Sequence, residues 1–161
     1  MIILLDIIKQ FFNSKKYSFV FLGDGPLLNE YREYVESTKF KANISFEGTV
    51  SNVNEYMANS KILLIPSKNE GNPIVVNEAF ASGMAIVGND VGGLHDMLKK
   101  VDVGGLAIPD NSESFADLSL NTLETIHNNR IKSIDYSKKT FDIGKTVDQY
   151  IKLFGIKNGK Q

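Results

Sequence analysis

The sequence predicts an α/β protein built on a doubly wound parallel sheet, and three observations lead to that fold class. Short strands that are apolar throughout alternate with amphipathic helices, which is typical of a parallel sheet covered by helices on both faces. The 161 residues are about one domain's worth, because domains commonly contain ~100–200 residues. Hydrophobic residues make up 42% of the chain and charged residues 23%, as in a globular domain rather than a disordered chain.

Five segments have the composition of buried strands. The first, residues 17–22, is a β-prone apolar run that stops at the turn-forming residues 23–26. Residues 62–65 and 84–87 are continuous apolar runs, which suit strands that are buried on both faces. The remaining two segments are residues 43–46 and the weaker run 105–108.

Apolar residues at helical spacing predict helices before and between these strands. Ile7, Ile8 and Phe11 mark an opening helix with one buried face. Pro73 is expected to open a later helix at its favoured first position, and Ser114 is expected to cap another. The other helical stretches are residues 27–35, a short helix after Ser51 or Asn52, residues 94–98 and a last helix over 143–154.

The order of these elements has one irregularity. The chain opens on a helix, whereas a doubly wound unit normally opens on a strand. Either the first strand is missing, or residues 1–5 form that strand instead of the start of a helix.

The charge balance and the scarcity of certain residues exclude several classes of function. Eighteen Lys and Arg against nineteen Asp and Glu leave a net charge of -1, without the positive excess typical of proteins that bind nucleic acids or anionic membranes. The absence of cysteine excludes disulfides and thiolate sites and fits a reducing compartment. No apolar run approaches the ~20 residues that cross a bilayer, and only two histidines are present, well apart. We therefore expect no metal, no nucleic-acid partner and no transmembrane segment.

Ligands of open parallel sheets bind at the carboxyl ends of the strands, so the loops there are the first candidates for a site. Gly23 and Gly25 would let the backbone approach a ligand closely, and Asp24 could accept hydrogen bonds from sugar hydroxyls. From the tripeptide alone, a plain strand-to-helix turn is the favoured explanation. It is not a dinucleotide fingerprint, because Leu28 stands where the third glycine would fall.

The segment from Glu70 to Glu78 carries more information. It places one carboxylate just before a helix and one inside it, while the helix start between them has free N–H groups and a dipole that favour a phosphate. Glu78 is expected to be buried among apolar neighbours and therefore to need partners, which ribose hydroxyls could supply. The alternative is an exposed Glu70 and a Glu78 that meets a lysine or a backbone amide. The residues expected at the helix start are Gly71, Asn72, Pro73 and Ile74.

A second glycine-rich helix start follows the strand at 84–87. The N–H groups of Gly92 and Gly93 could receive a phosphate or a sugar, and a glycine turn that enters a helix is the alternative. His95 follows in the first turn of that helix and His127 lies farther on. No acid or nucleophile is obviously paired with either histidine, so both are expected to be surface histidines.

The motifs in these loops, taken in order, resemble those of the group 1 (family 4) glycosyltransferases. The shared segments are residues 21–26, 43–50 and 66–67, the E-x7-E element of Glu70 and Glu78 with its Gly-x-Pro, residues 81–83 and residues 91–93. The resemblance extends from Met1 to the final helix and covers the C-terminal, nucleotide-sugar-binding domain of that family. It implies a Rossmann-like donor-binding domain over residues 1–140, with a helix over 141–161 that packs back on it.

The resemblance also implies an activity and a set of roles. Such enzymes have a two-domain (GT-B) fold and transfer a hexose with retained configuration from a nucleoside-diphosphate sugar to a glycan or lipid-linked acceptor, without a metal or other cofactor. Glu70 would be the catalytic residue that contacts hydroxyls of the transferred sugar, and Glu78 would hold the ribose. Donor-binding positions would further include Gly23, Asp24, Gly25, Val50, Gly71, Asn72, Pro73, Ile74, Gly92 and Gly93. A cytoplasmic protein of polysaccharide biosynthesis is expected, with a peripheral position at the inner membrane face left open for the full enzyme.

The chain departs from the family pattern in two places. The family's Gly-Gly-x-Pro-Glu is replaced by Gly92-Gly93-Leu94-His95-Asp96, which puts a role for that carboxylate in doubt. The family's first strand, its cationic Gly-Arg…Lys loop and the whole acceptor domain would precede Met1, so we expect the isolated chain to turn over nothing. Two alternatives stay open: an inactive fragment or partner subunit that binds only a nucleotide or docks to a separate acceptor domain, and a nucleotide-sugar epimerase.

Overall fold

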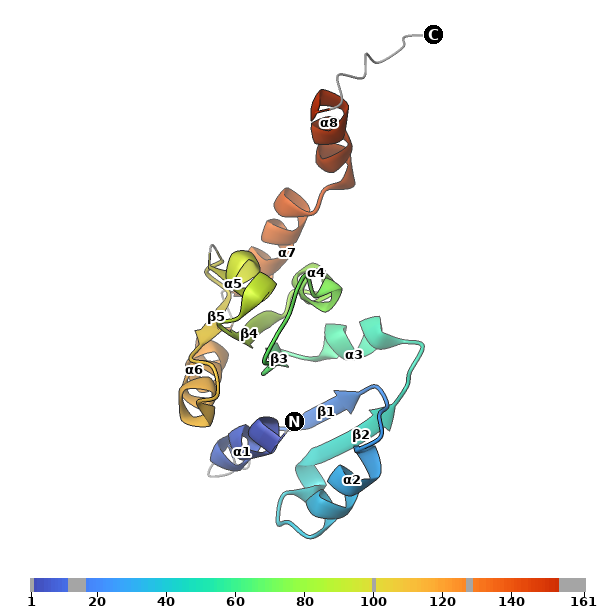
Figure 1. Cartoon of the computed structure of the whole chain (residues 1–161), viewed down its shortest axis with the longest axis vertical. Helices are drawn as coiled ribbons and strands as arrows, with labels where there is room; N and C mark the ends of the chain where they lie inside the picture. The colour runs from blue at the N-terminus through green and yellow to red at the C-terminus, as the bar shows by residue number, and fades with distance from the viewer. Residues whose placement is uncertain (1, 12–16, 100, 127–128, 154–161) are drawn as a thin grey trace.

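The computed structural model describes residues 2–11, 17–99, 101–126 and 129–153, and it is an α/β fold of parallel strands (Figure 1). The strands form two sheets: β1 pairs with β2, and β4 lies between β3 and β5. Every pairing is parallel. The strand bounds are Phe19–Leu22 (β1), Ile44–Gly48 (β2), Ile62–Ile65 (β3), Ala85–Asn89 (β4) and Gly104–Ala107 (β5). The predicted fold class is confirmed, and the sheet is divided into a part of two strands and a part of three.

Helices connect the strands and cover the sheets. The chain opens on α1, so the described residues before Asp6 are helical and do not form a strand. A short 3-10 turn, η1 (Lys41–Asn43), leads into β2. The helix bounds are Ile2–Phe11 (α1), Leu28–Glu36 (α2), Val53–Asn59 (α3), Ile74–Ala81 (α4), Gly92–Leu98 (α5), Ser112–Glu124 (α6), Asn129–Thr140 (α7) and Ile143–Leu153 (α8). Among the described helices, none is both long enough and apolar enough to cross a membrane.

The core lies on both faces of the three-stranded sheet. All five residues of β4 are buried, and successive side chains of that strand point to opposite faces. Ile86 packs with Phe80 of α4 and Leu94 of α5, while Val87 packs with Phe115 of α6 on the other face. A buried strand between two layers of helices is what the continuous apolar run at 84–87 predicts.

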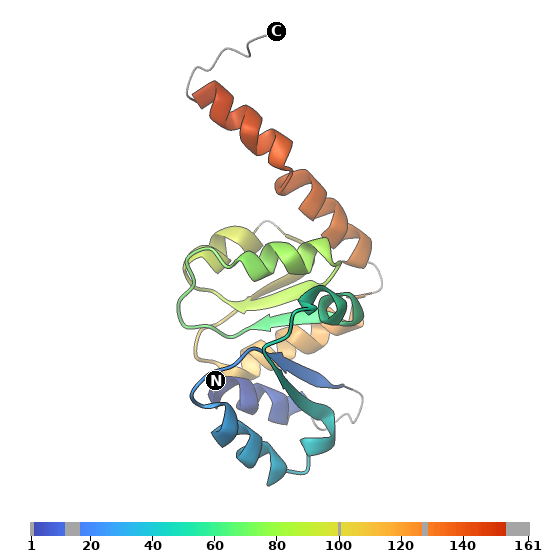
Figure 2. The ribbon, with the colours of Figure 1, turned by 90° about the vertical axis from the view of Figure 1, so that its right-hand side faces the viewer.

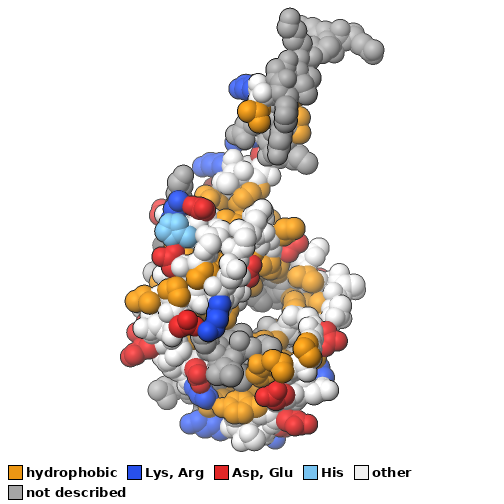
Figure 3. All heavy atoms as spheres, viewed as in Figure 1, with side chains coloured by type: hydrophobic (Ala, Val, Ile, Leu, Met, Phe, Trp, Pro, Cys, Tyr) orange, Lys and Arg blue, Asp and Glu red, His pale blue; other side chains and the backbone are white. Residues whose placement is uncertain are grey.

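Helix α1 joins the two sheets. Ile7 contacts the cluster of Val87 and Phe115, whereas the next residue, Ile8, packs with Tyr31 and Val35 of α2 beside the smaller sheet. The two faces of one helix therefore contribute to two hydrophobic clusters. In the space-filling view, one group of hydrophobic side chains lies on the lower part of the molecule, and others lie farther up among polar and charged side chains (Figure 3).

Several local predictions need correction. Helix α6 begins at Ser112 and its cap is Asn111, whose side chain accepts a hydrogen bond from the Ser114 N–H at 2.9 Å, so the prediction of Ser114 as the cap was wrong. Asn111 sits one turn earlier and can reach the free N–H groups of the first turn. Pro73 lies one residue before α4, with an extended ψ of 109°, rather than at its first position.

The C-terminal part of the chain contains a helix that the sequence pattern did not predict. Helix α7 is largely polar, yet the Ser133 hydroxyl is buried and donates to the Met84 carbonyl at 2.9 Å, and Tyr136 contacts Phe80 with ring centroids 5.0 Å apart. Helix α7 starts beside α4, and α8 continues away from the sheets (Figure 2). Helix α8 runs from Ile143 to Leu153 within the expected range 141–161, and residues 154–161 lie outside the described part. The packing of a helix over 141–161 back on the fold and the division of the chain at residue 140 stay predictions.

Candidate functional site

The predicted site residues fall into two groups at the carboxyl ends of the strands. One group follows β1 and β2, and the other follows β3 and β4. Because all pairings are parallel, the strands within each sheet end at one edge, as the sequence argument requires. Gly23, Asp24, Gly25 and Val50 lie at the end of the two-stranded sheet. The residues from Glu70 to Glu78, with Gly92 and Gly93, lie at the end of the three-stranded sheet.

The loops after β1 and β2 are tied to each other through their glycines. The Gly23 N–H donates to the Gly48 carbonyl at 2.7 Å. Gly23 has φ +108° and Gly48 φ +70°, in the left-handed region where a side chain would be strained. The Asp24 carboxylate accepts a hydrogen bond from the Gly25 N–H at 2.7 Å, and Gly23 through Gly25 are all exposed. Val50 lies two residues beyond Gly48 and is half-buried. We call Gly23, Asp24 and Gly25, with Val50, the rim at the ends of β1 and β2.

The loops after β3 and β4 are in direct contact, and Gly92 and Gly93 make that contact possible. The Gly93 N–H donates to the Glu70 carbonyl at 2.7 Å. A Cβ on Gly93 would lie 1.6 Å from the Gly71 carbonyl oxygen, and a Cβ on Gly92 would lie 2.3 Å from the Glu70 carbonyl oxygen. These two glycines are therefore required by the packing of one loop on the other. The amide of Gly93 is occupied within the protein and is not available to an anion.

Gly71 lies in the same loop but under different constraints. No atom would lie within 4 Å of a Cβ at this position, and its φ is outside the left-handed region. The neighbouring Asn72 is also exposed. Nothing in the protein itself therefore requires a glycine here, and the space above Gly71 is open.

The expectation that Glu78 is buried was wrong, because its side chain is exposed while that of Glu70 is half-buried. Helix α4 buries Val76, Ala79 and Phe80, which are three and four residues apart and share one face. Glu78 lies on the opposite stripe, four residues after Ile74, which is 69% exposed. Its apolar neighbours in sequence are thus on a different face, and the carboxylate needs no internal partner.

The start of α4 can receive an anion. The first N–H groups of an α-helix have no partner within the helix, and no side chain caps this helix. Pro73 itself has no N–H, so the available donors are the first amides that follow it. Glu70 precedes this helix start and Glu78 follows it by one turn, so one carboxylate lies on each side of the helix start in the sequence.

A buried side-chain amide, which no sequence motif marked, fixes the loop after β3. The Asn89 side chain, 2% exposed at the end of β4, donates to the Ser67 carbonyl at 3.1 Å. In the same loop, the Lys68 ammonium forms an exposed ion pair with Asp110 at 3.1 Å. An asparagine at the end of an otherwise apolar strand is the signal that could have indicated Asn89, because a buried polar side chain needs a partner.

His95 has an acidic partner that the sequence spacing did not reveal. Its Nδ1 atom lies 2.5 Å from the Asp90 carboxylate, and both side chains are roughly half-exposed. His95 is thus at the surface as expected, but it is paired. His127 lies outside the described residues. Among the described residues, no three His, Asp or Glu side chains gather closely enough to hold a metal ion.

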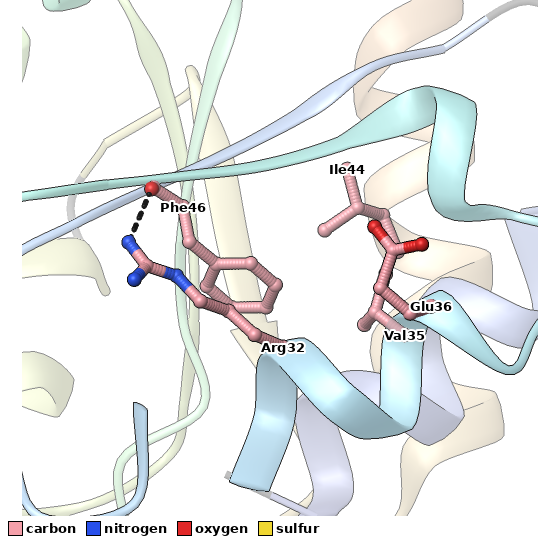
Figure 4. Close-up of a pocket in the computed structure, with 5 residues that line it drawn as sticks. All are labelled: Arg32, Val35, Glu36, Ile44 and Phe46. Carbon is pink, nitrogen blue, oxygen red and sulfur yellow. Dashed lines mark hydrogen bonds between the residues drawn. The ribbon is translucent and has the colours of Figure 1, made fainter. Parts of the chain in front are cut away.

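A shallow hollow elsewhere on the molecule contains none of the predicted site residues. It is lined by Arg32, Val35, Glu36, Ile44 and Phe46, between α2 and β2 (Figure 4). The Arg32 guanidinium donates to the Phe46 carbonyl at 3.0 Å, so it covers the outer edge of β2. The hollow is therefore separate from the predicted site residues.

Comparison with known proteins gives consistent results. The family model described as "Glycosyl transferases group 1" matches residues 1–125. N-acetyl-alpha-D-glucosaminyl L-malate synthase of Bacillus anthracis is 30% identical over 149 residues, which cover 86% of this chain and 39% of that protein.

Solved structures share the fold. Anabaena Alr3699/HepE in complex with UDP has a TM-score of 0.82 at 18% identity over 95% of this chain and 44% of that one. The pneumococcal O-GlcNAc transferase GtfA in complex with UDP and GlcNAc has a TM-score of 0.76 at 18% identity, over 96% of this chain and 33% of that one. The chain therefore spans less than half the length of these proteins.

Proposed function

Because the chain belongs to the group 1 glycosyl transferases, we propose that it forms the donor-binding part of a retaining glycosyltransferase. The reaction would transfer a hexose from a nucleoside-diphosphate sugar to a glycan or a lipid-linked acceptor. Solved relatives of the same fold were obtained with UDP or with UDP-glucose, which supports a nucleoside-diphosphate sugar as the donor class.

The observation that carries this proposal is the arrangement of the loop between β3 and α4. The Gly93 N–H and the buried Asn89 side chain hold this loop by donating hydrogen bonds to its backbone carbonyls. The space around Gly71 in the same loop is open, although nothing in the protein requires a glycine there. A loop that is fixed on one side and free of side-chain atoms on the other is suited to close approach of a ligand to the backbone.

The proposed roles follow from this geometry. The donor diphosphate would lie against the free amides at the start of α4, whose positive end also stabilises the charge that develops on the leaving group. Glu70 would accept hydrogen bonds from hydroxyls of the transferred sugar, and the exposed Glu78 from the two ribose hydroxyls. The rim of Gly23, Asp24 and Gly25, with Val50, would then receive the nucleoside.

The acceptor would bind to polypeptide outside these residues. The chain spans 39% of a curated relative and 44% of a structural one, so most of each of those proteins lies outside the match. We propose that the isolated chain binds the donor without transferring the sugar, and that the working enzyme lies in the cytoplasm or peripherally at the inner membrane face.

The roles of the two glutamates can be separated by calorimetry on the protein in the form that the cell makes. UDP and UDP-glucose would be titrated into the parent protein and into Glu78→Ala and Glu70→Gln, with GDP and ADP donors as the comparison for the base. Glu78→Ala should weaken UDP and UDP-glucose alike, by about 10- to 100-fold, because a hydrogen bond to a charged group contributes about 1.5–3 kcal/mol. Glu70→Gln should weaken UDP-glucose while leaving UDP nearly unchanged.

Glu124→Ala is the matched control, because Glu124 is also an exposed helical glutamate but lies at the end of α6. Undiminished binding of UDP by Glu78→Ala would exclude its ribose role. If no nucleotide of any base binds to the parent protein, donor binding by this chain is wrong, and an interaction subunit becomes the better explanation.

A further inference from the structure

The loops at the carboxyl ends of the strands carry almost only negative charge. In these loops, all of which belong to the described part of the chain, Lys68 is the single lysine or arginine. The acidic side chains there are those of Asp24, Glu70, Asp90 and Asp110. The loops comprise residues 23–27, 49–52, 66–73, 90–91 and 108–111. A ligand with two phosphates would meet carboxylates at these strand ends, and Lys68 is the cation that could offset their repulsion.

Hydrogen bonds fix the backbone on both sides of Lys68. On one side, the Ser67 carbonyl accepts from the buried Asn89 side chain at 3.1 Å. On the other, the Glu70 carbonyl accepts from the Gly93 N–H at 2.7 Å. The Lys68 side chain itself is 75% exposed, so a flexible stem with an ammonium group extends from an anchored backbone. The ammonium can therefore change partners without a movement of the loop.

The partner of Lys68 comes from the far side of the three-stranded sheet. The Lys68 ammonium lies 3.1 Å from the Asp110 carboxylate, which is 62% exposed. Lys68 follows β3 and Asp110 follows β5, while β4 lies between those strands, so the ion pair spans the end of β4. Ion pairs this exposed contribute little to stability, because water screens the attraction and two side chains must be held in place. A more highly charged anion would therefore compete effectively for the ammonium.

The same loop leads into the start of α4, where an anion can bind. Lys68 lies three residues before the open Gly71, and α4 begins at Ile74 without a side-chain cap. The helix start offers amides and a partial positive charge of roughly half an elementary charge. Lysine adds a full charge and binds phosphates as a compact point charge on a flexible stem. His95 is a weaker candidate for this task, since its Nδ1 atom is held 2.5 Å from the Asp90 carboxylate.

We propose that Lys68 is a donor-binding residue and that it exchanges Asp110 for the diphosphate of the nucleotide sugar. In the donor-free chain, the ammonium pairs with Asp110. With the donor at the start of α4, the ammonium turns toward the diphosphate and the Asp110 carboxylate is left to solvent. Asp110 thus competes with the donor for one cation, and the exchange favours a nucleoside diphosphate over a less highly charged monophosphate. This role rests on the proposed function and adds to it a pair of residues that sets the donor affinity.

Calorimetry at low ionic strength tests the exchange on the protein in the form that the cell makes. UDP would be titrated into the parent protein, Lys68→Met, Asp110→Asn and the double variant. Lys68→Met should weaken UDP by about 10-fold, because a charge-assisted hydrogen bond is lost. Asp110→Asn should instead strengthen UDP by about 2- to 5-fold, since the competing exposed pair is removed. That gain should vanish in the double variant, because it acts only through Lys68.

Two controls separate this exchange from a general effect of charge. Lys61→Met makes the same change in net charge, but Lys61 is an exposed residue just before β3, at the opposite end of that strand. This variant should bind UDP like the parent protein, and uridine, which has no phosphate, should not distinguish the variants. Equal weakening of UDP by Lys61→Met and Lys68→Met would overturn the proposal. A gain from Asp110→Asn that persists without Lys68 would also overturn it, because the gain would then reflect plain repulsion by Asp110.

The remaining outcomes distinguish the exchange from the proposed function. Weaker UDP binding by both Lys68→Met and Asp110→Asn would mean that the ion pair only supports the loop, which contradicts the exchange. Unchanged binding by Lys68→Met, with UDP bound to the parent protein, would exclude the role of Lys68 and leave donor binding intact. If the parent protein binds no nucleotide, the proposed function is wrong, and the exchange is wrong with it.

Discussion

The two sheets are built from similar residues and differ in how fully they are enclosed. In the larger sheet, β4 lies between two strands and two helix layers, and all of its residues are buried. In the smaller sheet, β1 is equally apolar but has alternating half-buried and exposed residues. An apolar sequence therefore shows that a strand is suited to burial. Whether the strand is buried depends on which strands and helices actually lie beside it.

The glycines show the same contrast. Gly92 and Gly93, beside the larger sheet, allow one loop backbone to lie against another and have no room for a side chain. Gly25, beside the smaller sheet, has open space around it, because a Cβ added there would meet no atom within 4 Å. Tight backbone packing is therefore found at Gly92 and Gly93, whereas open space lies around Gly25 and around Gly71.

The largest expected effect would come from truncating an aromatic residue in each region. Phe80 is fully buried and contacts the rings of Tyr136 and Phe141, so Phe80→Ala should lower the free energy of unfolding by about 3–5 kcal/mol. Phe21 is only half-buried, stacked on Phe46 with centroids 4.7 Å apart, so Phe21→Ala should cost about 1–2 kcal/mol. Urea unfolding followed by circular dichroism measures both. Equal losses would mean that the smaller sheet is as well packed as the larger one.

A smaller effect is expected from adding one methyl group to the loop after β3 or β4. Gly93→Ala places a Cβ against the Gly71 carbonyl and should cost about 1–3 kcal/mol, because the loops must separate. Gly71→Ala meets no atom and should change stability by no more than about 0.5 kcal/mol. Thermal unfolding compares the two variants. If Gly71→Ala is the more destabilising variant, the loop is not open in the way described.

The smallest effect is expected on the exposed side of α1, the helix that joins the two regions. Lys9 forms an ion pair with Asp6 at 2.8 Å, and both side chains are 44% exposed. Lys9→Met should lower the free energy of unfolding by about 0.3 kcal/mol, as for other exposed pairs. A larger loss would mean that charge, and not Ile7 and Ile8, holds α1 between the sheets.

The pH dependence of this pair has a defined direction. The hydrogen bond to Asp6, with a smaller contribution from Tyr34, raises the pKa of Lys9 above its usual 10.5. Because the folded state holds the proton more tightly, the stabilisation is fully present below pH 10.5 and is lost as the pH rises through the raised pKa. The difference between Lys9→Met and the parent protein in chemical unfolding should therefore be constant at neutral pH and vanish in strong alkali.

The sequence alone determined the type and order of the strands and of most helices. Apolar runs and helical spacing are local signals, and the glycines at 23 and 92–93 mark turns because backbone conformation is local too. The sequence did not indicate α7, because this helix is largely polar. The buried hydroxyl of Ser133 and the ring of Tyr136 hold α7 against the rest of the fold. It also misplaced the cap of α6, since Asn111 and Ser114 are both capping residues and only the backbone selects one.

Only the tertiary structure decided what the site residues can reach. The exposure of Glu78 depends on which stripe of α4 faces the sheet, and the occupied amide of Gly93 depends on a carbonyl from a loop 23 residues away along the chain. The pairing of His95 with Asp90 and that of Lys68 with Asp110 are likewise relations between separate segments. Sequence pattern specifies what each segment forms by itself, and packing specifies which of its groups remain free to bind.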